Sequence, residues 1–306
     1  MSAPTTPIGA PVSAPAGAPP GPRTATEPRT ATVPRAGTEP RARFRDLFAA
    51  EWIRFWSLRS MPWVLGVSAL VVIGANLKAA KYTYDHTTPD DPVSAAGASW
   101  AATNASFTVF AADIVMIVAG SVGAVVIVSE YATGMIRTTL AAVPDRRAVV
   151  TAKASVLAVV MLGYGGLTAG VSFGFGQAIL SGRHLGLSIT DPGALRVVSA
   201  AALLAPVCAF VGLALGVLIR HAAGTVVTTV LLLFLAPASF SESNRWTALV
   251  GHAMPLTAWQ RLARVDLTET LLPPYPATVG GSWAAYAAWP VLSLLVAVIV
   301  LRRRDL

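Results

Sequence analysis

Six long apolar runs, separated by charged or polar segments, constrain the fold of this chain more than any other feature. Each run is close to the ~20 apolar residues that a helix needs to cross a bilayer. None alternates polar with apolar residues, as the strands of a membrane β-barrel would. The sequence predicts an all-α polytopic membrane protein with six transmembrane helices in a domain of residues 61–301. The predicted helices are 62–78, 108–129, 154–180, 197–219, 222–240 and 283–301.

Composition agrees with this class and excludes others. The chain is 54% hydrophobic and 12% charged, whereas a soluble domain has about 25% charged residues. The single cysteine, Cys208, can form neither an internal disulfide nor a multi-cysteine zinc site. The net charge is +8, but the basic residues lie at the ends of apolar runs rather than in one patch. We therefore expect no nucleic-acid partner.

The placement of lysine and arginine predicts the orientation. Six crossings put both termini on one side, and if that side is the cytoplasm, the inner segments hold sixteen of the 23 basic residues. Inner loops of membrane proteins carry such an excess. We expect a multi-pass protein of the cell membrane, surrounded by lipids, with both termini cytoplasmic and residues 302–306 as a basic cytoplasmic C-terminus.

Residues 1–40 are predicted to form a disordered tail. Their composition is rich in Pro, Ala, Thr and Arg, and a Pro-Arg pair recurs every six residues from Pro22 to Arg41. No large apolar side chain occurs between Ala14 and Thr32, so burial cannot offset the entropy of ordering.

Residues 41–60 predict an interfacial amphipathic helix. Phe44, Phe48, Trp52 and Trp56 recur every four residues and are flanked by arginines. A helix with an aromatic stripe and basic flanks lies in the plane of the membrane interface.

No set of catalytic residues stands out. The phosphate-binding pattern G-x-x-x-x-G-K-[ST] is absent, because none of the three lysines follows a glycine. The four histidines fall in predicted loops without metal-ligand spacing. We expect that the chain is not an enzyme and binds no ATP, magnesium or other cofactor by itself.

Asp113 is the acidic residue inside a predicted span. A charge at mid-bilayer costs roughly 2.5–3.5 kcal/mol, which the apolar residues of that span outweigh. Two interpretations stay open. Asp113 lines a substrate path or proton relay, or its carboxyl group only contacts neighbouring helices near water.

The spacing of glycines suggests how the spans pack. Gly166, Gly170 and Gly174 share one face, and Gly212 and Gly216 repeat the spacing, which predicts close helix approach either within the chain or between subunits. The outer segment 241–282 predicts short re-entrant or lid helices rather than a seventh span, because its apolar run is too short.

The inner segment between the second and third spans, from Glu130 to Lys153, is the most informative one. Residues 133–143 predict a short amphipathic helix, which Pro144 ends. Such a helix projecting from a bundle is suited to binding another protein, and the alternative is a solvated linker.

This segment resembles a known family. Glu130-Tyr131-x-x-Gly134-x-x-Arg137-Thr138-x-Leu140, followed by Pro144-x-Arg146-Arg147 and Lys153, is similar to the second inner segment of ABC transporter permeases of the type-two exporter superfamily. The similarity includes the Glu51-Trp52 pair and the Arg303-Arg304-Asp305 terminus, and covers roughly residues 44–306. The resemblance implies a separate ATP-binding-cassette ATPase subunit and a coupling loop. That loop would contain Glu130, Tyr131, Gly134, Arg137, Pro144, Arg146 and Arg147.

Three functions follow as hypotheses. The first is the permease subunit of an ATP-binding-cassette exporter, working as a homodimer or with a homologous permease. The second is a proton-coupled secondary transporter that uses Asp113, although no three-plus-three repeat of spans is visible. The third is a non-transporting membrane anchor that recruits a partner. No residue set fixes a transported substrate.

Overall fold

The computed structural model describes residues 43–86, 102–134, 146–240, 244–263 and 275–303. Contacts along the chain separate residues 1–41 from the unit Ala42–Leu306, and the helices below all belong to the second unit. The expected disordered tail lies outside the described residues. The described part contains helices and turns and no strand.

Five helices are long and apolar enough to cross a membrane. The fold is therefore an all-helical, multi-pass membrane protein, as the apolar runs predict. The five helices are α2 (Ser60–His86), α4 (Val109–Ala132), α6 (Arg146–Ser181), α7 (Ala194–Ile219) and α12 (Val279–Arg303).

The run predicted as the fifth span is shorter than expected. It consists of α8 (Ala222–Val230), the π-helical turn η1 (Leu231–Leu235) and α9 (Ala236–Ala238). Together they make a short apolar helix, below the length of the five long ones. Pro237 lies in the last turn, which closes with hydrogen bonds from the Ser239 and Phe240 N–H groups to the Ala236 and Pro237 carbonyls. The prediction of a helix reaching residue 240 is wrong in this respect.

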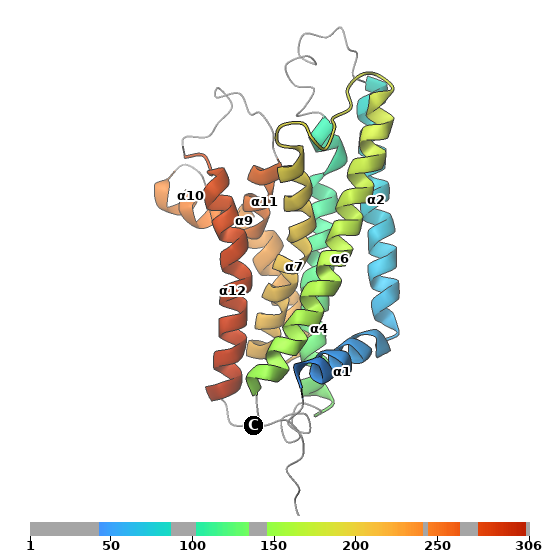
Figure 1. The fold of residues 1–306 in the computed structure, drawn as a ribbon. Coiled ribbons are helices and arrows are strands. Elements are labelled where there is room, and N and C mark those ends of the chain that lie inside the picture. Colours follow the sequence, from blue (N-terminus) through green and yellow to red (C-terminus); the bar gives the residue numbers. More distant parts are fainter. Residues whose placement is uncertain (1–42, 87–101, 135–145, 241–243, 264–274, 304–306) are drawn as a thin grey trace, which may run out of the picture. The chain divides into compact units, whose positions relative to one another are not determined.

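Side-chain hydrogen bonds fix the directions of the long helices. Ser68 and Asn76 of α2 bond to Tyr164 and Ser172 of α6, so equal steps along both helices keep them in register and they run parallel. Tyr286 donates to the Ala200 carbonyl, which joins the first halves of α12 and α7, so these two also run parallel. Figure 1 shows that α4, α7 and α12 descend while α2 and α6 ascend.

The segment before α12 contains two short helices, α10 (Arg245–His252) and α11 (Pro255–Ala263). Neither has the length of a span, in agreement with the expectation of short re-entrant or lid helices. The indole N–H of Trp289 donates to the Ala253 carbonyl at 2.7 Å, so the turn between α10 and α11 is held against the middle of α12 (Figure 1).

Glycines bring the backbones of α4 and α7 into contact. A methyl group built on Gly123 would lie 1.9 Å from the Ala209 oxygen, and one on Gly212 would lie 1.9 Å from the Gly120 oxygen. The expected close approach at Gly212 is therefore correct. Gly166, Gly170 and Gly174 make no close approach within the described part of the chain, because no other described atom lies within 4 Å of a methyl group at these positions. Packing of this face against another subunit stays a prediction. The close contact of α6 is made by Gly165, on another face of the helix, against Ala202.

This difference gives a direct test of the packing. Gly123→Ala is expected to lower the free energy of unfolding by about 1–3 kcal/mol, because a side chain there overlaps the backbone of α7. Gly166→Ala is the matched control and is expected to have no effect or to stabilise the helix slightly. Thermal unfolding of the two purified variants measures the difference, and equal melting temperatures would contradict the close contact.

Candidate functional site

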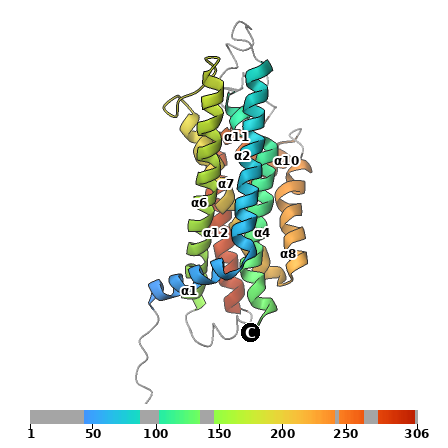
Figure 2. The same ribbon diagram turned by 90° about the vertical axis from the view of Figure 1, so that its right-hand side faces the viewer.

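The helix α1 (Phe44–Ser57) lies across the ends of the long helices rather than along them, as Figures 1 and 2 both show. Its aromatic stripe is continuous, since the ring centroids from Phe44 to Phe48, Trp52 and Trp56 are 6.0–6.5 Å apart. Trp52 and Trp56 are well exposed. This is the exposed aromatic face that a helix in the membrane interface requires.

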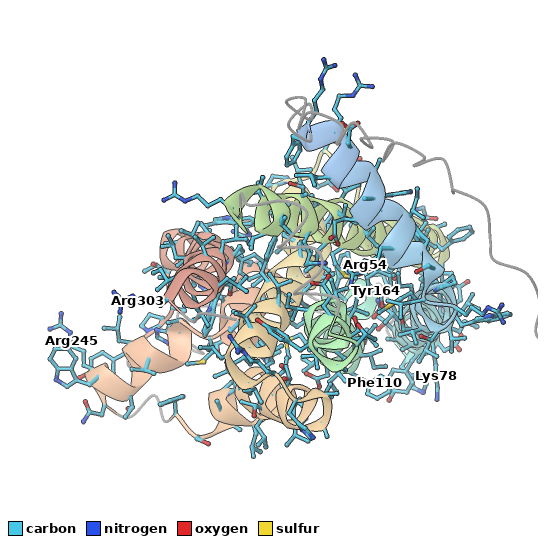
Figure 3. The ribbon with its side chains drawn as sticks, turned by 90° about the horizontal axis from the view of Figure 1, so that it is seen from below. Arg54, Lys78, Phe110, Tyr164, Arg245 and Arg303 are labelled. Atoms are coloured by element: carbon cyan, nitrogen blue, oxygen red, sulfur yellow. The ribbon has the colours of Figure 1, made fainter. Side chains whose placement is uncertain are left out.

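The buried face of α1 carries a charge. Its buried residues are Glu51 and Phe55. We call the end of the bundle that holds α1, the last turn of α4 and the first turns of α6 the α1 end. Figure 3 looks onto this end and shows Arg54 on the side of α1 that faces the other helices.

Four charged side chains from three helices meet there and form what we call the charge cluster. They are Glu51 and Arg54 of α1, Glu130 of α4 and Lys153 of α6. The Lys153 Nζ lies 2.5 Å from the Glu51 Oε2 and also pairs with the Glu130 Oε1. The Arg54 Nη1 lies 2.8 Å from the same Glu130 oxygen and 3.8 Å from the Glu51 Oε1.

The charge cluster is buried and electrically balanced. Glu130 is 2% exposed, Lys153 4% and Glu51 9%, and two acids face two bases. Removing one partner from a buried pair leaves an uncompensated charge and costs about 3–5 kcal/mol. The Arg54 side chain is 23% exposed, so three of the four groups are buried. The cluster links α1, α4 and α6, and the loss of one buried member is expected to weaken that link.

The local course of the chain explains why these groups meet. The helix α6 begins at Arg146, eight residues before the predicted span, so Lys153 lies inside the helix rather than in a loop. Glu130 occupies the last turn of α4. A cavity of about 20 Å³ lies beside them, lined in part by Phe55, Ser129 and Val156. That volume is enough for one water molecule.

Tyr131 and Gly134, two further residues of the expected coupling loop, follow Glu130 of the charge cluster in the chain. The guanidinium of Arg220, in the turn between α7 and α8, stacks on the Tyr131 ring with its carbon 4.9 Å from the centroid. Gly134 has φ of +69° and donates its N–H to the Tyr131 carbonyl. A positive φ is a backbone conformation that favours glycine, so Gly134 allows α4 to end and the chain to turn there.

The rest of the expected coupling loop is only partly described. Arg137 and Pro144 lie outside the described residues. Arg146 begins α6, and Arg147 is exposed in its first turn. A short helix was expected to begin at Thr133, but Thr133 instead forms the C-cap of α4.

Asp113 is not part of this arrangement. It lies in α4 seventeen residues before Glu130, which is about 25 Å along the helix axis. Asp113 and Glu130, the two acidic residues of α4, therefore lie near opposite ends of the helix.

Sequence reasoning found Glu130 but missed the partners that balance it. Glu51 and Lys153 belong to the family resemblance, yet nothing in their spacing indicates that they meet. The signal that could have found them is chemical. Glu51 interrupts the apolar side of an amphipathic helix and Lys153 adjoins an apolar run, and such charges are stable only when paired.

Comparison with known proteins adds no assignment: no protein-family model matches the chain, and no curated protein matches it. Among the described residues, no group of three or more His, Cys, Asp or Glu side chains could hold a metal ion.

Proposed function

We propose that this chain is the permease subunit of an ATP-binding-cassette exporter, driven by a separate ATPase subunit that docks at the α1 end. The permease would act as a homodimer or beside a homologous permease, with six crossings and cytoplasmic termini. The observation that carries the proposal is the charge cluster, because it lies at both ends of the segment that we expect to contact the ATPase.

The two ends of that segment meet at the charge cluster. The chain leaves the bundle just after Glu130 and returns just before Lys153, and these two side chains form a buried pair. Glu51 and Arg54 join the same cluster from α1. A force applied between Gly134 and Arg146 would therefore reach α4, α6 and α1 together. A solvated linker needs no buried ion pair between its two ends.

The directions of α7 and α12 support a total of six crossings. The helix α7 ends at the α1 end, while α12 starts at the opposite end and returns (Figure 1). The intervening chain must travel back across the bundle, and α8, η1 and α9 account for most of that distance. We propose that this short run serves as the fifth of six crossings.

The direct experiment is co-purification of the chain with a co-expressed ATP-binding-cassette ATPase, followed by ATP hydrolysis in lipid nanodiscs. We expect a stable complex that hydrolyses ATP and no hydrolysis by this chain alone. Hydrolysis by the isolated chain would contradict the proposal. Transport driven by a proton gradient without the ATPase would favour the secondary transporter, and partner binding without transport would favour the anchor.

The orientation has its own test. Thr190, between α6 and α7, and Arg147, in the first turn of α6, are both exposed at opposite ends of the bundle. A membrane-impermeant thiol reagent added to intact cells is expected to label Thr190→Cys and not Arg147→Cys. The native Cys208 is fully buried, so it gives little background. Labelling of Arg147→Cys in sealed cells would reverse the proposed orientation.

A further inference from the structure

We infer that the groove between α2 and the start of α4 binds the headgroup of an anionic phospholipid from the surrounding bilayer. Such a site goes beyond the proposed function and does not depend on it, because it needs only that the long helices cross a membrane. The lining of the groove, its depth along α2 and the charges at this end of the bundle all point to this ligand.

The groove combines a positive charge with neutral hydrogen-bond donors. Its volume is about 660 Å³, and Lys78, His86, Tyr82 and Asn104 belong to its lining, whereas none of its described lining residues is acidic. Lys78 takes part in none of the ion pairs in the described part of the chain. An ammonium group beside hydroxyl and amide donors is complementary to a phosphate, which carries negative charge and several acceptor oxygens.

The charged and apolar walls of the groove lie at different levels. The Thr108 N–H and hydroxyl donate to the Asn76 Oδ1, which places these two residues at one level. Because α2 and α4 run in opposite directions (Figure 1), Lys78 lies two residues to one side of that level and Phe110 two residues to the other. Their Cα atoms are therefore about 6 Å apart along the bundle. The charge lies nearer the end of the bundle, and the aromatic ring lies nearer its middle.

Lys78 also lies at the depth where the headgroups of a bilayer begin. It is 18 residues after Ser60, the first residue of α2, which corresponds to about 27 Å along the helix. The hydrocarbon core of a bilayer is about 30 Å thick, and α1, just before Ser60, has the exposed aromatic face of a helix in one interface. Lys78 is therefore close to the opposite interface. Tyr82, one turn further on, is 64% exposed, as is typical of the aromatic belt at that depth.

The exposed apolar surface next to the groove favours a lipid over a soluble anion. Val71 of α2 is exposed and lies one turn before Ala75, which lines the groove. Phe110, on the α4 side, is 63% exposed. Figure 3 shows Phe110 and Lys78 on the same side of the bundle. Acyl chains can cover this apolar surface while the phosphate stays beside Lys78, whereas a soluble anion would leave it uncovered.

The neighbouring charges do not cancel that of Lys78. Asp85, the acidic residue of α2, pairs with Lys81 at 2.5 Å and lies seven residues beyond Lys78, which is about 10 Å along the helix. Arg183, just after α6, lies over the Tyr84 ring with its guanidinium carbon 4.6 Å from the centroid. It adds positive charge to the last turns of α2, so this part of the bundle attracts an anion.

The test measures lipid binding to the purified full-length chain without an ATPase, with bound lipids counted by native mass spectrometry. Phosphatidylglycerol and phosphatidylcholine with the same acyl chains are titrated separately, and we expect phosphatidylglycerol to bind more tightly. One basic group near a membrane surface changes the affinity for an anionic lipid about fivefold. Lys78→Gln is therefore expected to weaken phosphatidylglycerol binding by about that factor and to leave phosphatidylcholine binding unchanged. Lys78→Arg is expected to retain the preference.

Arg245→Gln is the matched control, because it removes the same charge from an exposed residue of α10 on a side of the bundle away from Lys78 (Figure 3). It is expected to leave lipid binding unchanged. Phe110→Ala is expected to weaken the binding of both lipids alike, because the ring contacts acyl chains. Equal affinity of the wild-type chain for the two lipids would overturn the inference. So would an equal loss in Lys78→Gln and Arg245→Gln, because net charge alone would then account for the binding.

Soluble anions are tested as competitors. Inorganic phosphate and glycerophosphoglycerol, the deacylated headgroup, are added to the lipid-bound chain at increasing concentrations. Neither is expected to displace phosphatidylglycerol, because both lack acyl chains. Displacement by the deacylated headgroup at a concentration similar to that of the lipid would make the groove a soluble-anion site and contradict the lipid assignment. If Lys78→Gln does not fold, the two lipids and the competitors on the wild-type chain still decide the question.

Discussion

Lys153→Met is expected to lower the free energy of unfolding by about 3–5 kcal/mol, the largest effect of any single substitution considered for this chain. Lys153 pairs with both Glu51 and Glu130 inside the bundle. Its removal leaves two buried carboxylates close together, with Arg54 as their remaining base in the charge cluster. Thermal or denaturant unfolding of the purified variant measures the loss, and α1 is expected to detach first because its buried face depends on Glu51.

Lys81→Met provides the matched control. Lys81 pairs with Asp85 at 2.5 Å, but both side chains are exposed. Exposed pairs contribute about 0–1 kcal/mol, so this variant is expected to melt close to the wild type. Adding Glu130→Gln to Lys153→Met removes one of the two carboxylates, so that Glu51 and Arg54 balance each other, and is expected to restore part of the stability. If the two lysine variants were equally stable, the charge cluster would not hold the three helices together.

Gly134→Pro is expected to abolish ATP hydrolysis coupled to this chain while the bundle still inserts into the membrane. Gly134 has φ of +69°, whereas proline is fixed near −65° and has no N–H to donate to the Tyr131 carbonyl. The chain would then leave α4 in another direction, and the segment that we expect to contact the ATPase would be displaced. Co-purification and ATP hydrolysis, at matched membrane abundance, measure the effect.

Gly134→Asn separates backbone geometry from side-chain size. Asparagine tolerates positive φ better than other residues with side chains, so this variant is expected to keep most of the coupled activity. Normal coupling in Gly134→Pro would indicate that the segment after α4 is a linker and would remove the main support for the exporter.

The helical class and most helix positions could be predicted from the sequence because they depend on local apolar runs. The helix ends could not. The helix α6 begins at Arg146, eight residues before the predicted span, because an apolar run marks only the membrane-spanning part of a helix and not its polar first turns. The helical run from Ala222 ends at Ala238, two residues before the predicted end, at the point where serines follow the apolar run.

The candidate site was predictable only in part, for the same reason. Glu130, Tyr131 and Gly134 are close in sequence, so one motif contains them. Glu51 and Lys153 are separated by 102 positions, and they meet only because α1 lies across the ends of α4 and α6. The glycine stripe on α6 meets no other helix within the described part of the chain, because spacing identifies a smooth helix face, whereas the partner of that face depends on the whole assembly. Gly165, outside the predicted stripe, makes the contact instead.

The contacts at Gly123 and Gly212 have a mechanical consequence. Where two backbones touch, one helix cannot slide along the other without atomic overlap, so α4 and α7 behave as a single rod. Glu130 is attached near one end of that rod, and Asp113 and Phe110 lie near the other. A displacement of the α1 end would therefore move the far end of α4, about 25 Å away, together with α7.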